Sequence, residues 1–499
     1  MKLNRWFIGT VIGAQFAFNT LAADSPDTNR DADIEALKQQ IRALSQKVDA
    51  LQQQREVDSK VAAGVSATQA QDLDQQIKIL ARQRELDQDA AVAAAKTAPK
   101  LSVGAGGLSV SSADSNFVFS LKGLLQVDNR TFFNESQIKG NDSFLLRRAR
   151  PIFQGTVYRD FDFVFVPDFG GSSVQIFDAY VNYRYAPWLQ LRAGKFKVPV
   201  GLEQLQSDPV TAFNERSLVT DLVPNRDIGF QLGGDINGGV LSYAVGVFNG
   251  VGDSRNTANS DFEDHREFAG RVFVQPFKNT DIAALQNLGF GIAGTWGNVS
   301  SNSTSLSGTT GGTLPGYTTD GQQQFFSYTN AAVAGDGTHW RLSPQAYYYY
   351  GPLSLLGEYV ISDQQVRKGA IKADLQNKAW QVTAGWVLTG ESAAFTGVTP
   401  RHPFDLKNGG WGAFQVVGRY AELEIDKATF PVFANPAASA SAAHAWSAGL
   451  NWYLNKNLRV NASYSHTTFT GGGGAGTTAP ATVTRQPEDV VFTRVQLAF

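Results

Sequence analysis

The sequence predicts an all-β transmembrane barrel of about 16 antiparallel strands, preceded by an N-terminal α-helical coiled-coil segment. From residue 117 to residue 499, segments of roughly ten residues alternate apolar and polar side chains, the pattern of a strand between lipid and water. The connections between these segments are mostly short and long in turn. After the first 22 residues no run of about 18 apolar residues occurs, which excludes a helical membrane protein.

The composition excludes several classes of function. The chain has 18% charged residues, a net charge of -2 and no cysteine. The lack of cysteine excludes disulfide scaffolds, thiolate catalysis and Cys-ligated metal centres, and the net charge argues against a nucleic-acid partner. The 5 histidines lack metal-ligand spacing, and no Gly-x-Ser-x-Gly motif or Gly-rich phosphate-binding loop occurs. We therefore expect neither an enzyme nor a cofactor.

Residues 1–23 have the features of a secretory signal peptide. Lys2 and Arg5 give a charged start, residues 6–18 are mostly apolar, and Ala22 and Ala23 are small residues suited to a cleavage site. The apolar stretch is too short to span a bilayer comfortably. We therefore predict that the chain is exported.

Residues 24–90 are predicted to form a coiled coil. Their apolar residues are spaced alternately by three and four positions, which is the seam at which helices associate. The seam residues are Ile34, Leu37, Ile41, Leu44, Val48 and Leu51, and the pattern partly resumes at Leu73, Ile77 and Leu80. The number of associating helices stays open, as does a single amphipathic helix lying on its own chain. Residues 91–116 are rich in Ala, Gly and Ser, and we interpret them as a linker.

The barrel is predicted over residues 117–499. In its first strand Phe117, Phe119 and Leu121 alternate with Ser120 and Lys122, so the two sets face opposite sides of the sheet. Strands are expected to begin near residues 117, 143, 160, 173, 188, 227, 239, 266, 288, 338, 352, 378, 410, 443, 457 and 488. An even number of strands returns both ends of the chain to the same side of the membrane.

The connections indicate the orientation of the barrel. Short ones, such as 159–160 and 351–352, suit periplasmic turns, and long ones suit external loops. The third external loop, at about 198–226, is rich in charge and proline. The connection at 391–409 departs from this rhythm, because it is long where a short turn is expected.

Alternation alone also fits a large soluble β-sandwich or propeller. The export signal, the rhythm of the connections and the terminal Phe499 favour a barrel in the bacterial outer membrane, surrounded by lipid, with the coiled segment in the periplasm. A terminal aromatic residue after an alternating apolar strand resembles the recognition signal of outer-membrane barrels. The barrel-assembly machinery is therefore an expected partner through Phe499.

Cationic side chains are expected on the inner face of the barrel. If the apolar sets face lipid, the second strand directs Arg148 and Arg150 inward, whereas Arg147 has the opposite parity and must lie at a rim or break register. Asp178 is an acidic inward candidate, and the other cationic ones are Lys122, Arg130, Arg184, Arg192, Arg271, Arg419, Arg459 and Arg494. Guanidinium groups along a narrow aqueous path attract anions and set selectivity. Taken singly, each is more often a wall residue paired with a carboxylate.

Several blocks resemble the phosphate-selective porin O/P family. They are Gly194–Glu203, Asn214–Leu218 and Pro224–Gly229, and Leu146–Arg150 is similar to the family's second strand. The resemblance spans roughly residues 117–499. It implies a trimeric sixteen-stranded channel with an inward-folded third loop and with arginines along a path for phosphate or polyphosphate.

The resemblance also implies roles for single residues. It places Arg147 and Arg148 at the constriction and Arg216 in the inward loop. Phosphate-specific members carry a lysine shortly before the block that matches Asn214–Leu218. This sequence has Ser207–Val210 there, without a lysine, which leaves a general anion channel open.

Three hypotheses of function follow. The first is a passive, anion-preferring, water-filled outer-membrane porin for phosphate or polyphosphate. The second is a general or sugar-type porin without a specific phosphate site, in which the Tyr347–Tyr350 run forms an aromatic slide. The third is a barrel with a mainly structural role, whose coiled segment drives assembly, for example of a homotrimer, or tethers the envelope.

Overall fold

The chain divides into two compact units, residues 1–94 and residues 95–499, which are described separately. The computed structural model describes residues 28–61, 67–134, 138–171, 173–254, 256, 264–300, 314, 316–329, 333–474 and 484–499. The predicted signal peptide, residues 1–23, lies outside the described residues.

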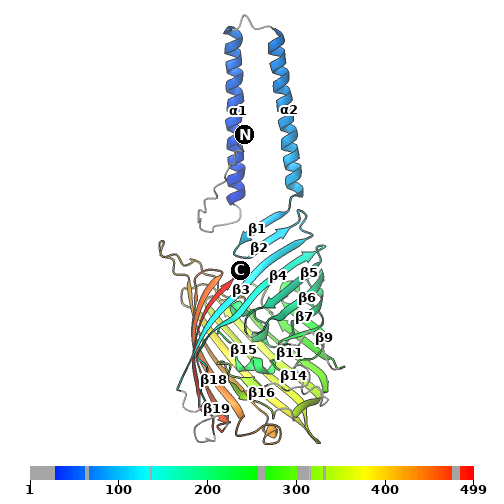
Figure 1. Cartoon of the computed structure of the whole chain (residues 1–499), viewed down its shortest axis with the longest axis vertical. Helices are drawn as coiled ribbons and strands as arrows, with labels where there is room; N and C mark the ends of the chain where they lie inside the picture. The colour runs from blue at the N-terminus through cyan, green and yellow to red at the C-terminus, as the bar shows by residue number, and fades with distance from the viewer. Residues whose placement is uncertain are drawn as a thin grey trace, which may run out of the picture. The chain divides into compact units, whose positions relative to one another are not determined.

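The first unit is helical, as predicted. α1 spans Thr28–Val61 and α2 spans Ala67–Thr97 (Figure 1). The seam side chains of α1 are exposed, with Leu37 at 61% and Leu51 at 65%. An exposed apolar seam suits association with a further helix, so the coiled coil stays a prediction. Within the described residues, no helix is long and apolar enough to cross a membrane.

The segment predicted as a linker, residues 91–116, contains regular structure. It holds the end of α2 and an antiparallel hairpin of β1 (Lys100–Gly104) and β2 (Gly107–Ser111). β2 pairs with the first residues of β3 (Val118–Phe133). Leu and Val alternate weakly with Ser in this segment, but its many small residues make the alternation hard to recognise. Pairing with the edge of β3 stabilises the hairpin.

The second unit contains a closed antiparallel barrel. Sixteen strands, β3–β11 and β14–β20, pair in chain order, and β20 pairs with β3 to close the ring (Figure 1). After β3, their bounds are β4 Ser143–Val157, β5 Phe161–Asp168, β6 Gln175–Ala186, β7 Leu189–Lys197, β8 Arg226–Ile236, β9 Leu241–Phe248, β10 Glu267–Val274, β11 Leu288–Ser300, β14 Val333–Tyr350, β15 Leu353–Lys368, β16 Ile371–Val387, β17 Ala413–Glu424, β18 Ala440–Tyr453, β19 Leu458–Gly471 and β20 Glu488–Ala498. The predicted fold class is confirmed. The largest differences are β14 and β16, which begin at Val333 and Ile371 rather than near 338 and 378.

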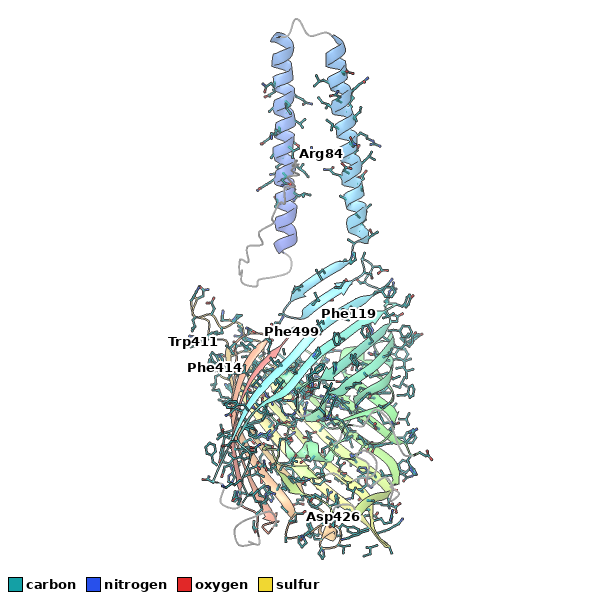
Figure 2. The ribbon with its side chains drawn as sticks, in the orientation of Figure 1. Arg84, Phe119, Trp411, Phe414, Asp426 and Phe499 are labelled. Carbon is teal, nitrogen blue, oxygen red and sulfur yellow. The ribbon has the colours of Figure 1, made fainter. Side chains whose placement is uncertain are left out.

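The two faces of the barrel wall have opposite polarity. On β3 the inward Gln126 and Asp128 are 0% and 2% exposed, whereas the outward Leu125 and Val127 are 42% and 43% exposed. Figure 2 places Phe119 and Trp411 on the outer surface, where they are 42% and 59% exposed. A soluble sheet buries its apolar face, so this inverted arrangement excludes the sandwich or propeller alternative and fits a wall with lipid outside.

The connections distinguish the two ends of the barrel. At one end, here called the short-turn end, strands are joined by short segments such as 158–160, 187–188 and 351–352. At the other, the loop end, the connections are mostly long. The long connection at 388–412 lies at the short-turn end, as its position in the chain predicted. Part of it turns into the barrel, where the ring of Phe395 stacks on that of Tyr347 at 5.3 Å between centroids.

The third loop, residues 198–225, folds into the barrel, as the resemblance implied. It carries α3 (Leu202–Leu205), η1 (Asp208–Val210) and η2 (Leu218–Leu222), and most of its residues are buried. Backbone carbonyls of the loop accept hydrogen bonds from the far wall. Asn451 Nδ2 donates to Ala212 O at 3.0 Å, and Arg459 Nη1 donates to Thr211 O at 2.9 Å.

Apolar side chains from several loops fill the lumen near the loop end. η2 packs there against the short hairpin of β12 (Tyr317–Thr318) and β13 (Gln324–Phe326) and against Phe433. This core includes Leu375 and Leu423 from the inner wall. The open space in the described barrel is therefore concentrated between the third loop and the short-turn end.

Candidate functional site

A cavity of about 940 Å³ lies inside the barrel, between the third loop and the short-turn end. Its wall is formed mainly by β3–β9, and its roof by third-loop residues including Ser207 and Asp208. The charged side chains that line it are Lys122, Arg150, Asp178, Arg192, Lys197, Asp208, Arg226, Asp235, Arg271 and Lys456. Cationic side chains thus outnumber carboxylate side chains seven to three.

Five of these cations form no ion pair within the part of the chain that the structure describes: Lys122, Arg192, Lys197, Arg271 and Lys456. The Arg192 guanidinium lies over the ring of Tyr180 at 4.6 Å. The Arg271 guanidinium lies over Phe273 at 4.6 Å, and its Nε donates to the Gln345 side chain at 3.0 Å. Aromatic faces and amides hold a guanidinium without cancelling its charge. These side chains therefore present positive charge to the cavity.

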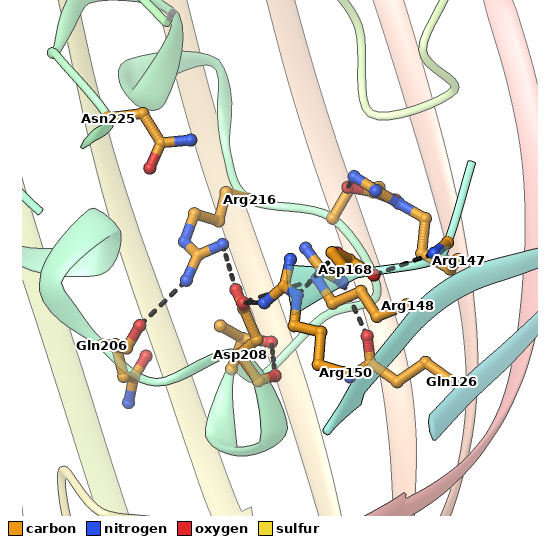
Figure 3. Close-up of polar contacts among 12 residues, drawn as sticks. Gln126, Arg147, Arg148, Arg150, Asp168, Gln206, Asp208, Arg216 and Asn225 are labelled. Carbon is orange, nitrogen blue, oxygen red and sulfur yellow. Dashed lines mark hydrogen bonds and ion pairs between the residues drawn. The ribbon is translucent and has the colours of Figure 1, made fainter. Parts of the chain in front are cut away.

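A second group of arginines converges on the third loop (Figure 3). Arg148 and Arg150 from β4 and Arg216 from the loop all point toward the carboxylate of Asp208. Arg216 Nη1 lies 2.7 Å from Asp208 Oδ1, Arg148 Nε lies 3.5 Å from Oδ2, and Arg150 Nη1 donates to Oδ2. Arg150 Nε also donates to Asp168 at 2.6 Å. We call Arg148, Arg150 and Arg216 the arginine cluster.

A register shift explains how Arg147 reaches the same region. In the pairing of β3 with β4, Gln126 lies opposite Arg148 and Val127 lies opposite Leu146, so Arg147 is an extra residue. Such a bulge turns a side chain to the other face of the sheet. Arg147 donates to both carboxylate oxygens of Glu215 in the third loop, at 2.6 and 2.9 Å. Its odd parity in the sequence is thus resolved by a break in register.

The two loop carboxylates are strongly acidic in this setting. Burial by itself raises the pKa of Glu215, but Arg147, Arg148 and Arg494 outweigh burial and lower the pKa to about 2. Burial likewise opposes ionisation of Asp208, and the arginine cluster together with Lys197 holds its pKa well below the usual range. Both groups are therefore charged at neutral pH, and both bind the loop to β4.

The remaining predicted residues lie in different places. Asp178 lines the cavity and pairs with Arg226 at 3.2 Å. Arg130 Nη1 donates to Gly321 O at 2.8 Å, so it contacts a loop rather than the arginine cluster. Arg184 pairs with Asp162 at 2.8 Å near the short turn at 158–160 and is not part of the cavity wall.

Residues 119–499 match the family described as phosphate-selective porin O and P. The chain belongs to this family. A relative is Porin O of Pseudomonas aeruginosa, 26% identical over 401 residues that cover 72% of this chain and 85% of the relative.

The barrel also resembles solved porin structures at low sequence identity. The anion-selective porin from Comamonas acidovorans superposes with a TM-score of 0.47 at 13% identity, covering 77% of this chain and 100% of that chain. The outer membrane channel DcaP of Acinetobacter baumannii gives a TM-score of 0.48 at 10% identity, covering 77% and 98%. Family membership makes this protein an outer-membrane porin, a channel rather than an enzyme.

Sequence reasoning missed several residues of the porin's site. Lys197 and Arg226 lie opposite each other at the ends of β7 and β8, where parity is hard to assign before the strand ends are known. Asp208 was visible only as part of a charge-rich loop. The Tyr347–Tyr350 run forms no continuous slide, because Tyr347 is covered by Phe395 and Phe273 and Tyr350 is exposed on the outside.

Proposed function

We propose that this porin forms a passive, water-filled channel that prefers anions, with phosphate among its solutes. The observation that supports it most directly is the positive excess of the cavity wall, in which Lys122, Arg192 and Arg271 carry charge that no described carboxylate neutralises. The net charge of the whole chain is -2. The preference for anions must therefore arise locally, from side chains along the path.

The size of the effect can be estimated from Coulomb's law. An anion about 6 Å from one unneutralised cation gains roughly 1 kcal/mol at an effective dielectric constant intermediate between protein and water. Each such cation therefore raises the local concentration of anions in the path several-fold. Three of them along one cavity are enough for a clear preference without a tight site.

Phosphate and polyphosphate are the proposed solutes within this class. The family is described as phosphate-selective, and guanidinium groups match the geometry of phosphate oxygens. Arg147, Arg148, Arg150 and Arg216 are proposed to act where the third loop narrows the path. Cations spaced along the path, including Lys122 and Arg192, suit a chain of phosphates.

Reversal potentials across a planar bilayer with a KCl gradient test this proposal. The wild type should prefer chloride, and Arg192→Gln should lower the ratio of chloride to potassium permeability by roughly threefold. Arg184→Gln is the matched control, because it makes the same change in charge outside the cavity wall and should change the ratio by less than about half as much. A cation-preferring wild type would remove the proposal. Liposome swelling that favours sugars over anions would instead support a sugar-type pore.

We further propose a homotrimer in the outer membrane, with α1 and α2 in the periplasm. The exposed seam of α1 supports association. Phe499 is 43% exposed at the end of β20, which suits recognition by the barrel-assembly machinery. Deleting residues 24–97 and measuring oligomer stability and conductance separates assembly from permeation. Loss of oligomer with conductance retained is the expected result.

A further inference from the structure

We propose that Asp208 is a tethered carboxylate that occupies an anion-binding site of this porin and so keeps the channel from holding phosphate tightly. The site is the arginine cluster, and its natural competitor is a free phosphate dianion in the cavity. This inference rests on the proposed anion channel and names the residue that sets its specificity.

The arginine cluster offers more donors than Asp208 uses. Three guanidinium groups from two separate elements converge on one carboxylate (Figure 3). Arg148 is only 6% exposed, yet its Nε has no hydrogen-bond partner within the described residues. A carboxylate has two oxygens that can accept hydrogen bonds, whereas phosphate offers more acceptor oxygens to the same three guanidinium groups. The geometry therefore suits a larger and more highly charged oxyanion than Asp208.

The site also borders the aqueous path. Asp208 and Arg150 both line the 940 Å³ cavity, together with the neighbouring Ser207 and Pro209. An anion that crosses the cavity therefore comes next to the tethered carboxylate. With Asp208 charged, that anion meets a like charge at the point where the donors converge, which disfavours its capture.

The charge balance around the arginine cluster explains why Asp208 decides whether the cluster binds free phosphate. Arg150 retains Asp168 as a second partner at 2.6 Å. Among the described residues Arg148 and Arg216 form ion pairs with Asp208 only, while Glu215 acts on Arg148 from beyond ion-pair distance. Neutralising Asp208 thus leaves the buried Arg148 guanidinium and the largely buried Arg216 guanidinium without an ion-pair partner, and buried charges strongly favour acquiring a counterion. Free phosphate can supply it.

The backbone of the third loop is held independently of Asp208. Gln496 Nε2 donates to Pro209 O at 3.0 Å, and Gln206 Nε2 donates to Phe395 O at 2.9 Å. The bonds from Asn451 and Arg459 to Ala212 and Thr211 described above also remain. A neutral side chain at position 208 removes one of the loop's attachments to β4, while these backbone bonds continue to hold the loop and the arginine cluster becomes available to an anion.

Inhibition of chloride current by inorganic phosphate, measured on single channels in a planar bilayer, tests this assignment. In Asp208→Asn, the phosphate concentration that halves the chloride current should fall at least tenfold below the wild-type value. Asp208→Ser should act in the same direction, and Asp208→Glu should stay within about twofold of wild type. Asp253→Asn is the matched control. Asp253 is a buried loop carboxylate bound by Arg341 at 2.7 Å, but it does not line the cavity.

The outcomes separate this inference from the proposed function. Equal phosphate inhibition in wild type, Asp208→Asn and Asp208→Ser, with chloride preference retained, overturns the role of Asp208 and leaves the anion channel standing. A tenfold gain in Asp253→Asn as well also overturns it, because the effect would then follow net charge. Cation preference in all five proteins, the wild type and the four variants, removes the anion channel itself. Heat-modifiable migration on gels verifies that each variant is folded.

Discussion

Glu215→Gln is the sharpest test of how the third loop is held against β4. The substitution keeps the size of the side chain and removes the charge that receives two bonds from Arg147, at 2.6 and 2.9 Å. Arg148 from β4 and Arg494 from β20, the latter at 3.9 Å, also face this carboxylate. Glu215 itself is 6% exposed. The variant therefore leaves buried or half-buried arginines with less compensation.

The magnitude follows from the acidity of Glu215. Its pKa is lowered from 4.5 to about 2, which corresponds to roughly 3 kcal/mol of stabilisation by the charged form. Because the folded pKa is depressed, this contribution is fully present above pH 4.5 and is lost as the pH falls toward about 2. In the variant it is missing at every pH, so the loop should open on the order of 100-fold more often.

Hydrogen–deuterium exchange, followed by mass spectrometry on peptides that cover residues 205–222, measures this opening. Exchange in Glu215→Gln should be on the order of 100-fold faster at neutral pH, and the wild type should lose protection as the pH approaches 2 after correction for intrinsic exchange. Asp162→Asn is the control, because the Asp162–Arg184 pair is half-exposed and worth little. Protection within threefold of wild type in a folded Glu215→Gln barrel would refute the reasoning.

Two further substitutions test the wall and the lumen. Gly194→Ala should abolish the folded, heat-modifiable form, because φ is 129° and a Cβ would lie 2.2 Å from Ala179 O. Gly270→Ala is the control and should fold normally, because the nearest atom to its Cβ would be 4.0 Å away. Equal yields of folded protein from the two variants would contradict this prediction. Phe395→Ala should raise single-channel conductance by a measurable fraction, because it removes a ring stacked at 5.3 Å on Tyr347 inside the barrel; unchanged conductance would show that the ring lies off the ion path.

The strands could be predicted because lipid and water impose a strict alternation on every residue of the wall. The alternation of Gln126 and Asp128 with Leu125 and Val127 is visible without any tertiary information. The same rule identified Arg147 as an exception, although it could not decide between a rim and a bulge. Whether Arg147 lies at a rim or in a bulge depends on how β4 pairs with β3, and the residue pattern of β4 alone does not reveal that pairing.

The candidate site was less predictable, because it depends on contacts between residues far apart in the chain. Arg150 and Asp208 are separated by 58 residues, and Arg419 reaches Glu203 across 216. No local pattern encodes these pairings. The arginines were therefore found as a set, while the carboxylate that neutralises three of them emerged only from the folded third loop.

The β1–β2 hairpin has a consequence for how the ring of strands closes. β2 occupies β3 from Val118 to Leu121, and β20 pairs along the same edge only from Leu124 onward. Asn457 Nδ2 donates to Ala105 O at 2.7 Å and to Ala498 O at 2.6 Å, joining the hairpin turn to the last strand. The hairpin thus fixes the register in which the barrel closes. A shift of β20 along β3 toward Val118 would require backbone hydrogen bonds that β2 already occupies.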